Sequence, residues 1–295
     1  MKRLALTTAL LALLAPTALA QGTLPGPKTV DLGSGLHVII GQGGNIGVSA
    51  GADGVFVIDD QYPGTAPTNL EKIKAIAGGA PNYLVNTHWH ADHAGGNAAF
   101  GTAGAMIFAH ENVRKRLTAE VASIGIDGKA AAAAPEVAWP VVTFAEGIDF
   151  HLNDETIRIV HVKSSHTDGD AMVWFIEPNV LHMGDLFFNG VYPVIDLRSG
   201  GSVRGYLDVM KDTLAKVNDT TKIIPGHGDV GTKADLAKQI AMLDGAMKAV
   251  EAEVKKGRTL QQVIAARPLK PWANYAWSFI SEESFTTTLY NGLKQ

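Results

Sequence analysis

The segment from Asn86 to His93 carries the densest group of potential metal ligands in the chain. It reads Asn-Thr-His-Trp-His-Ala-Asp-His and follows the apolar run Tyr83 to Val85. Alternate side chains of an extended segment share a face, so His88 and His90 can point the same way. Asp92 and His93, where the chain turns, can then point to a second position nearby. The spacing therefore predicts that one short segment serves two metal ions.

Three further candidate ligands share this setting, because each lies just past an apolar strand. They are His166 after Ile157 to Val162, Asp185 after Val180 to Met183, and His227 after Ile223-Ile224. Strand ends at one sheet edge converge in space, so we expect all seven side chains to meet in one cleft. Imidazole and carboxylate donors suit zinc, with iron and manganese as alternatives.

Composition narrows the chemistry of the chain. None of its 295 residues is a cysteine, which excludes disulfides, thiolate ligands and a cysteine nucleophile. The net charge is −4 and Lys and Arg form no basic block, so nucleic acid is not an expected partner. The length suits one larger α/β domain, and a small-molecule substrate is the expected partner.

The N-terminus has the pattern of a secretory signal peptide. Lys2 and Arg3 precede a mostly apolar run from Leu4 to Ala15, and Ala18-Leu19-Ala20 resembles a cleavage site. We predict cleavage between Ala20 and Gln21, which separates a signal peptide (1–20) from a single catalytic domain (21–295). The apolar run is too short to span a bilayer, so no membrane association is expected after cleavage. An uncleaved anchor or a buried helix is the alternative, and the pattern does not separate periplasmic from secreted protein.

Strand and helix patterns alternate along the chain. Apolar β-type runs cover 36–40, 54–59, 83–85, 106–109, 148–152, 156–162, 171–176, 180–183 and 222–224. Helices are expected from Thr68 or Asn69 to Gly78, after Gly95-Gly96, from Ser202 onward, and over most of the chain after 230. The region from Leu117 to Pro140 suggests a loose helix over 130–134 or a mobile flap. Two β-rich halves, each followed by helices, favour an α/β fold with a four-layer αββα sandwich.

The ligand motifs resemble those of the metallo-β-lactamase superfamily. The matching parts are His-x-His-x-Asp-His at 88–93, Ser-Ser-His-Thr-Asp-Gly at 164–169, Gly184-Asp185, and Pro-Gly-His-Gly at 225–228. The resemblance implies the αββα fold and two zinc ions. It assigns His88, His90 and His166 to one ion, Asp92, His93 and His227 to the other, and Asp185 to both. A hydroxide between the ions would attack the substrate, while Asp92 and Asp185 orient it and pass a proton to the leaving group.

Departures from known subfamilies narrow the expected activity. His90 stands where oxygen-reducing di-iron members carry Glu, and the lack of cysteine excludes the lactamases that use a thiolate ligand. Asp185 as a bridging residue is more similar to hydroxyacylglutathione hydrolases and lactonases. The residues after it, Leu186 to Asn189, offer no cation for a β-lactam carboxylate.

These observations predict an exported, zinc-dependent hydrolase of a carbonyl-centred bond: a β-lactam amide, lactone, ester or thioester. Alternatives are a sulfur-handling or phosphodiester-cleaving member of the same fold, or a non-catalytic metal-binding accessory protein. The oligomeric state stays open. We expect the remaining histidines to be structural or exposed, namely His37, His110, His151, His161 and His182.

Overall fold

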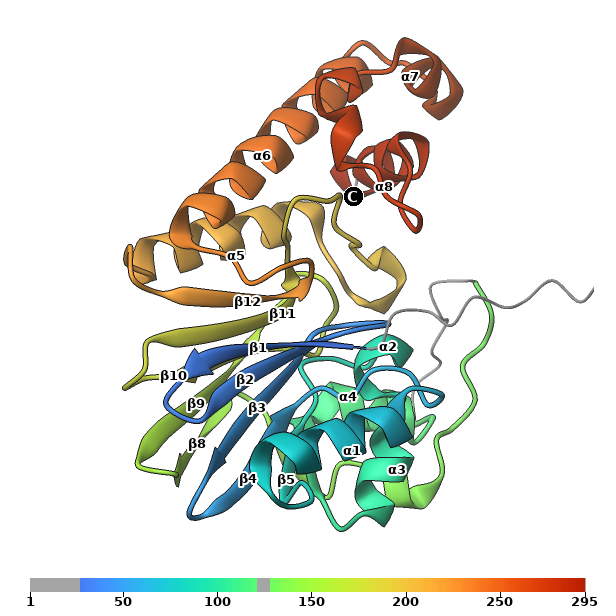
Figure 1. Cartoon of the computed structure of the whole chain (residues 1–295). Helices are drawn as coiled ribbons and strands as arrows, with labels where there is room; N and C mark the ends of the chain where they lie inside the picture. Colours follow the sequence, from blue (N-terminus) through green and yellow to red (C-terminus); the bar gives the residue numbers. More distant parts are fainter. Residues whose placement is uncertain (1–26, 121–127, 295) are drawn as a thin grey trace, which may run out of the picture.

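Two β-sheets pack face to face in the computed structural model, which describes residues 27–120 and 128–294 (Figure 1). The first sheet has its strands in chain order: β1 (Lys28–Gly33), β2 (Leu36–Ile40), β3 (Ile46–Gly51), β4 (Gly54–Ile58), β5 (Tyr83–Val85), β6 (Met106–His110) and β7 (Val142–Phe144). The second sheet has the order β12 (Lys222–His227), β11 (Val180–Phe188), β10 (Asp170–Phe175), β9 (Glu155–Val162) and β8 (Gly147–Leu152). The predicted signal peptide lies outside the described residues.

Strand β4 shows how its sequence selects this arrangement. Val55 and Val57 belong to the core beneath the helices, whereas Phe56 and Ile58 belong to the core between the sheets. Side chains alternate across a strand, so an unbroken apolar run is needed where both faces are buried. The strand therefore defines an inner layer of the molecule.

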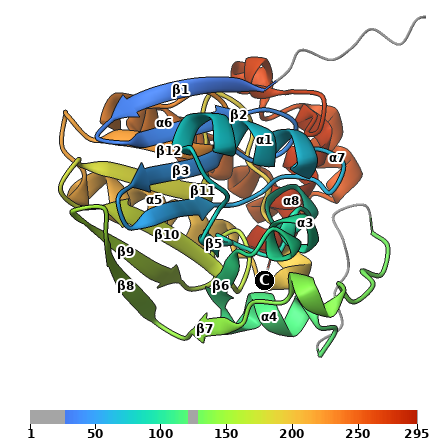
Figure 2. The same cartoon turned by 60° about the horizontal axis from the view of Figure 1, so that its bottom comes forward.

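Helices cover the outer face of each sheet. The first sheet carries α1 (Ala66–Ala77), α2 (Ala91–Ala94), α3 (Asn97–Thr102) and α4 (Glu111–Leu117). The second carries α5 (Val203–Lys216), α6 (Lys233–Lys255), α7 (Leu260–Ala266) and α8 (Glu282–Leu293), with the short 3-10 turns η2 (Leu197–Ser199) and η3 (Lys270–Tyr275). The 3-10 turn η1 (Glu136–Ala138) contacts α3. The orange helices α5 and α6 lie beside β11 and β12, and the red helices α7 and α8 pack on them (Figure 1). Helices α1 and α3 lie on the first sheet (Figure 1, Figure 2). The predicted α/β fold with four αββα layers is confirmed.

Several predicted boundaries were wrong. Helix α1 begins at Ala66 after Thr65, with Pro67 in its first turn, a position that suits proline because its missing N–H has no partner there anyway. Strands β1, β3 and β7 were not predicted. Residues 130–134 form no helix, and residues 121–127 of the predicted flap lie outside the described part of the chain. Within the described residues, no helix is long and apolar enough to cross a membrane.

Candidate metal centre

The His-rich segment forms a loop after β5, without the strand-like alternation that was expected to orient His88 and His90. It joins β5 to α2, and Asp92 and His93 lie in the first turn of α2. His88, His90 and His93 are each at most 2% exposed. The loop and the helix therefore bring the four side chains together without strand alternation.

Asp185 lies within β11 and His227 ends β12, because both strands run further than their apolar cores predicted. The pairing of β11 with β12 shifts register around Gly184, which has φ +50°. A Cβ there would lie 2.7 Å from the Thr87 hydroxyl, so the position requires glycine. The register shift positions Asp185 beside the imidazoles. His166 arrives from the loop between β9 and β10.

In the first group of ligands, His88, His90 and His166, three imidazole lone pairs face one another. His90 Nδ1 lies 3.1 Å from His88 Nε2 and 2.9 Å from His166 Nε2. The opposite nitrogens each meet an oxygen: Thr87 Oγ1 at 3.1 Å for His88, Asp196 Oδ2 at 3.1 Å for His90, and the Val194 carbonyl at 2.8 Å for His166. Since the Thr87 hydroxyl donates to Asp59, all three oxygens accept the ring protons. The three nitrogens that face one another therefore carry no proton, and three such acceptors together can bind a cation.

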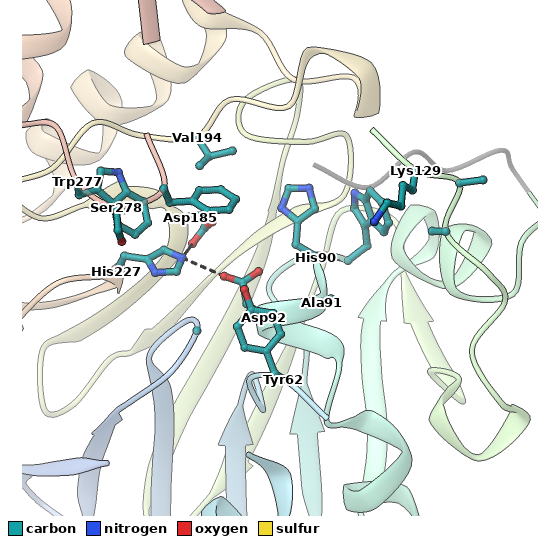
Figure 3. Close-up of a pocket in the computed structure, with 15 residues that line it drawn as sticks. Tyr62, His90, Ala91, Asp92, Lys129, Asp185, Val194, His227, Trp277 and Ser278 are labelled. Atoms are coloured by element: carbon teal, nitrogen blue, oxygen red, sulfur yellow. Dashed lines mark ion pairs between the residues drawn. The ribbon is translucent and has the colours of Figure 1, made fainter. Parts of the chain in front are cut away.

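In the second group, Asp92, His93 and His227, imidazoles meet carboxylates. His93 Nδ1 donates to Asp59 Oδ2 at 2.7 Å, which directs its Nε2 to Asp185 Oδ1 at 3.0 Å. His93 Nε2 and Asp185 Oδ1 are both buried, and neither has a hydrogen bond among the described residues. His227 Nε2 lies 3.3 Å from an oxygen of Asp92 and 3.3 Å from Asp185 Oδ1 (Figure 3).

Asp185 lies between the two groups. Its Oδ2 is 3.8 Å from His88 Nε2 and 3.5 Å from His166 Nε2, whereas its Oδ1 faces His93 and His227. Ligand atoms of His88, His90, His166 and Asp185 all lie within 4.8 Å of one another, as do those of Asp92, His93 and His227. The buried nitrogen and oxygen donors therefore fit two adjacent divalent cations.

The two groups differ in electrostatics. Burial lowers the pKa of His166 to about 4, and burial with nearby imidazoles lowers the pKa of His88. Burial also opposes protonation of His227, but Asp185 and Asp92 outweigh it and raise its pKa to about 9. His88 and His166 thus present neutral imidazoles, the form that binds metal, and the carboxylates of the second group present a negative field that attracts a cation.

Two supporting carboxylates were missed in the sequence. Asp59 is fully buried and accepts from the backbone N–H and hydroxyl of Thr87 as well as from His93. It directly follows the apolar strand β4, which is the same signal that marked the ligands themselves. Asp196, the partner of His90, follows no such strand, and no sequence pattern marks it.

Three of the other histidines, His110, His161 and His182, have defined hydrogen-bond or stacking partners, as expected for structural residues. His182 is buried and bonds the Asn45 carbonyl and the Gly184 N–H. His110 stacks on His161 with ring centroids 3.7 Å apart.

A cavity of about 650 Å³ opens over Asp92, Asp185 and His227. Its walls carry Tyr62, Trp89, Trp277 and Phe279, and Lys129 also lines it (Figure 3). None of these five residues was predicted as a substrate contact. They come from separate segments of the chain, and no local sequence pattern indicates that these segments meet.

The fold and the His/Asp cluster define a metal-binding α/β sandwich of the hydrolase type. A sequence profile of the metallo-beta-lactamase superfamily matches residues 40–227, which include all seven candidate ligands. The chain belongs to this superfamily, as the motifs indicated.

Individual relatives agree with this assignment. The chain is 28% identical over 167 residues to a hydroxyacylglutathione hydrolase from Polaromonas sp., a match that covers 55% of each chain, so it spans about half of that relative. A metallo-beta-lactamase from Pontibacter korlensis is similar with a TM-score of 0.62 at 18% identity, covering 74% of this chain and 99% of that one. An inverting sec-alkylsulfatase from Pseudomonas sp. is similar with a TM-score of 0.64 at 18% identity, covering 90% of this chain and 50% of that one. At these identities the structural likenesses establish the fold.

Proposed function

We propose that the chain is a dinuclear, zinc-dependent hydrolase of a carbonyl-centred bond, with His88, His90, His166 and Asp185 at one ion and Asp92, His93, His227 and Asp185 at the other. The position of Asp185 carries this proposal, because its two oxygens face the two imidazole groups separately. A carboxylate in that position joins two cation sites into one centre. Iron or manganese would suit the same donors.

Bound divalent ions would supply a Lewis acid for the substrate oxygen and lower the pKa of water towards neutrality. The protein would contribute orientation and proton transfer. Asp92 lines the cavity, and its side chain is 14% exposed. We assign it the role of orienting water and passing a proton to the leaving group, while the buried Asp185 holds the two groups in register.

The relative's name supports the carbonyl-centred class, since a hydroxyacylglutathione hydrolase cleaves an acylated glutathione. We therefore propose thioesters, esters and lactones ahead of β-lactams. We also propose that the protein is exported after cleavage near Ala20, which the intact mass of protein purified from an extracellular or periplasmic fraction would test.

Metal content tests the centre. Protein purified with zinc supplementation should contain close to two metal ions per chain by elemental analysis. A reproducible value near zero would contradict the whole proposal.

A substrate panel tests the reaction. Nitrocefin, homoserine lactones, thioesters, alkyl sulfates and phosphodiesters should be compared with and without chelator. Chelator-sensitive hydrolysis of a thioester, ester, lactone or lactam is expected. Cleavage of the sulfate or phosphodiester alone would instead support the second class of activity, and no chelator-sensitive turnover would support an accessory protein.

A further inference from the structure

An aromatic wall stands over the second ligand group. Trp277 lies with its ring centroid 5.6 Å from that of His227 and 5.7 Å from that of Phe279. The fully buried Phe188 supports this side from within, because it stacks on His227 at 4.9 Å with an interplanar angle of 16° and lies 6.2 Å from the Trp277 ring. The wall therefore adjoins the atoms at which the proposed chemistry occurs.

The wall is held in place by backbone contacts. Trp277 Nε1 donates to the Tyr192 carbonyl at 3.0 Å, and the Trp277 N–H donates to the Ile280 carbonyl at 3.1 Å. The bond to Ile280 closes the turn between η3 and α8. The bond from Nε1 to Tyr192 fixes the indole plane. Phe279 follows in the same turn and is 50% exposed. A fixed apolar surface left open beside a reactive centre is a binding surface for an apolar group.

Charge is unevenly distributed along the cavity. Among the described residues that line it, Lys129 is the one Lys or Arg, and it lies at the opposite end from Trp277, with His90 and Asp92 between them (Figure 3). Near the wall, the lining residues Ser278 and Val194 carry no charge. A carboxylate bound along Trp277 and Phe279, away from His227 and the other ligands, would therefore lose its hydration without gaining a Lys or Arg partner.

We propose that Trp277 and Phe279 form a specificity subsite for an uncharged alkyl or aromatic acyl group of the substrate, which rests on the proposed hydrolysis of a carbonyl-centred bond. The scissile carbonyl would lie over Asp92 and Asp185, with its acyl chain along the aromatic wall. Both residues lie outside the span 40–227 that matches the superfamily, so the subsite belongs to this chain's own C-terminal segment.

A series of p-nitrophenyl esters tests the subsite on the zinc-loaded protein. Each fully buried methylene strengthens binding roughly fourfold, so kcat/KM for the hexanoate should exceed that for the acetate by at least about tenfold. The mono-p-nitrophenyl ester of adipic acid, which matches the hexanoate in length but ends in a carboxylate, should show no such gain. The preference should collapse in Trp277→Ala and weaken in Phe279→Ala.

Two variants control for damage to the fold. Trp277→Phe keeps an apolar ring and should keep most of the preference, whereas Val141→Ala removes an apolar side chain that is 69% exposed and outside the cavity lining and should leave it unchanged. A wild-type preference that does not rise with chain length would overturn the subsite. So would a rising preference that survives both Trp277→Ala and Phe279→Ala.

Binding of hydroxamates separates this inference from the proposed reaction. By calorimetry, octanohydroxamate should bind the zinc-loaded protein at least about tenfold more tightly than acetohydroxamate, and Trp277→Ala should remove the difference. Chain-length-dependent binding without ester hydrolysis would retain the subsite and reject the reaction. Hydrolysis with equal binding of both hydroxamates would retain the reaction and reject the subsite.

Discussion

The two ligand groups hold their side chains by different means. In the first group each imidazole is buried, and its outer nitrogen is fixed by an oxygen that accepts its proton. In the second group the imidazoles lie against carboxylates, and Asp92 and His227 are each 14% exposed towards the cavity. Hydrogen bonds to outer oxygens fix all three imidazoles of the first group and His93 of the second, whereas Asp92 and His227 are distinguished by their mutual charge and their access to the cavity.

This difference assigns separate tasks to the two halves. A group with fixed lone pairs and little solvent access is suited to retaining a cation and stabilising the fold. A group with an exposed carboxylate beside an open cavity is suited to contact the substrate. The predictions below test whether the two tasks separate in this way.

Asp185→Asn should have the largest effect, because it removes the charge that both groups share. We expect metal content to fall from two ions towards one or fewer. We also expect kcat/KM to fall by at least about a thousandfold, since several kcal/mol of electrostatic stabilisation would be lost. Elemental analysis and steady-state kinetics measure both, with Asp219→Asn on the exposed surface as the matched control. Two retained ions with activity within tenfold of wild type would show that the groups do not depend on a common carboxylate.

Asp92→Ala and His166→Ala compare the two tasks directly. Asp92→Ala should lower kcat/KM by at least about a hundredfold through loss of proton transfer, with little change in the stability of the metal-free protein. His166→Ala removes a side chain that is 1% exposed and its bond to the Val194 carbonyl, so it should also lower the free energy of unfolding by about 1–3 kcal/mol. Chemical denaturation of metal-free samples provides the measurement. Equal losses of stability would remove the distinction between the halves.

Asp59→Asn and Asp196→Asn test the supporting carboxylates of the second and first group. Loss of such a partner typically weakens metal binding by about 10–100-fold. Asp59 should lie at the upper end of this range, because it is fully buried and lies 2.7 Å from its imidazole, whereas Asp196 is 6% exposed and lies 3.1 Å from His90. Competition with a coloured chelator gives the affinities. A smaller effect for Asp59 than for Asp196 would indicate that the first group depends more on its outer carboxylate.

The sequence predicted the centre better than it predicted the local geometry. His166 and His227 follow apolar strands, and Asp185 follows an apolar strand core, so the convergence of sheet edges brought them beside His88 to His93 as expected. The extension of β11 through Asp185 was not predictable, because it depends on the long-range pairing of β11 with β12 and on the shift at Gly184.

The cavity walls were less predictable than the ligands. Trp277 contacts His227 across 50 positions of sequence, and Asp196 reaches His90 across 106. Neither contact is accompanied by a local hydrophobic period or a characteristic residue spacing in the sequence. The edge strand β7 has only three residues, which is too short for an alternating hydrophobic pattern to be recognised.

The stacked pair His110 and His161 provides the smallest test, because it lies outside both ligand groups and, among the described residues, neither ring forms an ion pair with a carboxylate. Burial and the adjacent His161 lower the pKa of His110 to about 4, below the ordinary value of 6.5. The unfolded chain therefore binds a proton that the folded chain excludes, so stability should decrease as pH falls from about 6.5 to 4. His110→Phe keeps a flat ring without the charge. Between pH 7 and pH 5, its free energy of unfolding should fall by about 1 kcal/mol less than that of wild type, while metal content stays unchanged. Loss of metal in this variant would mean that imidazoles outside the two groups also support the centre.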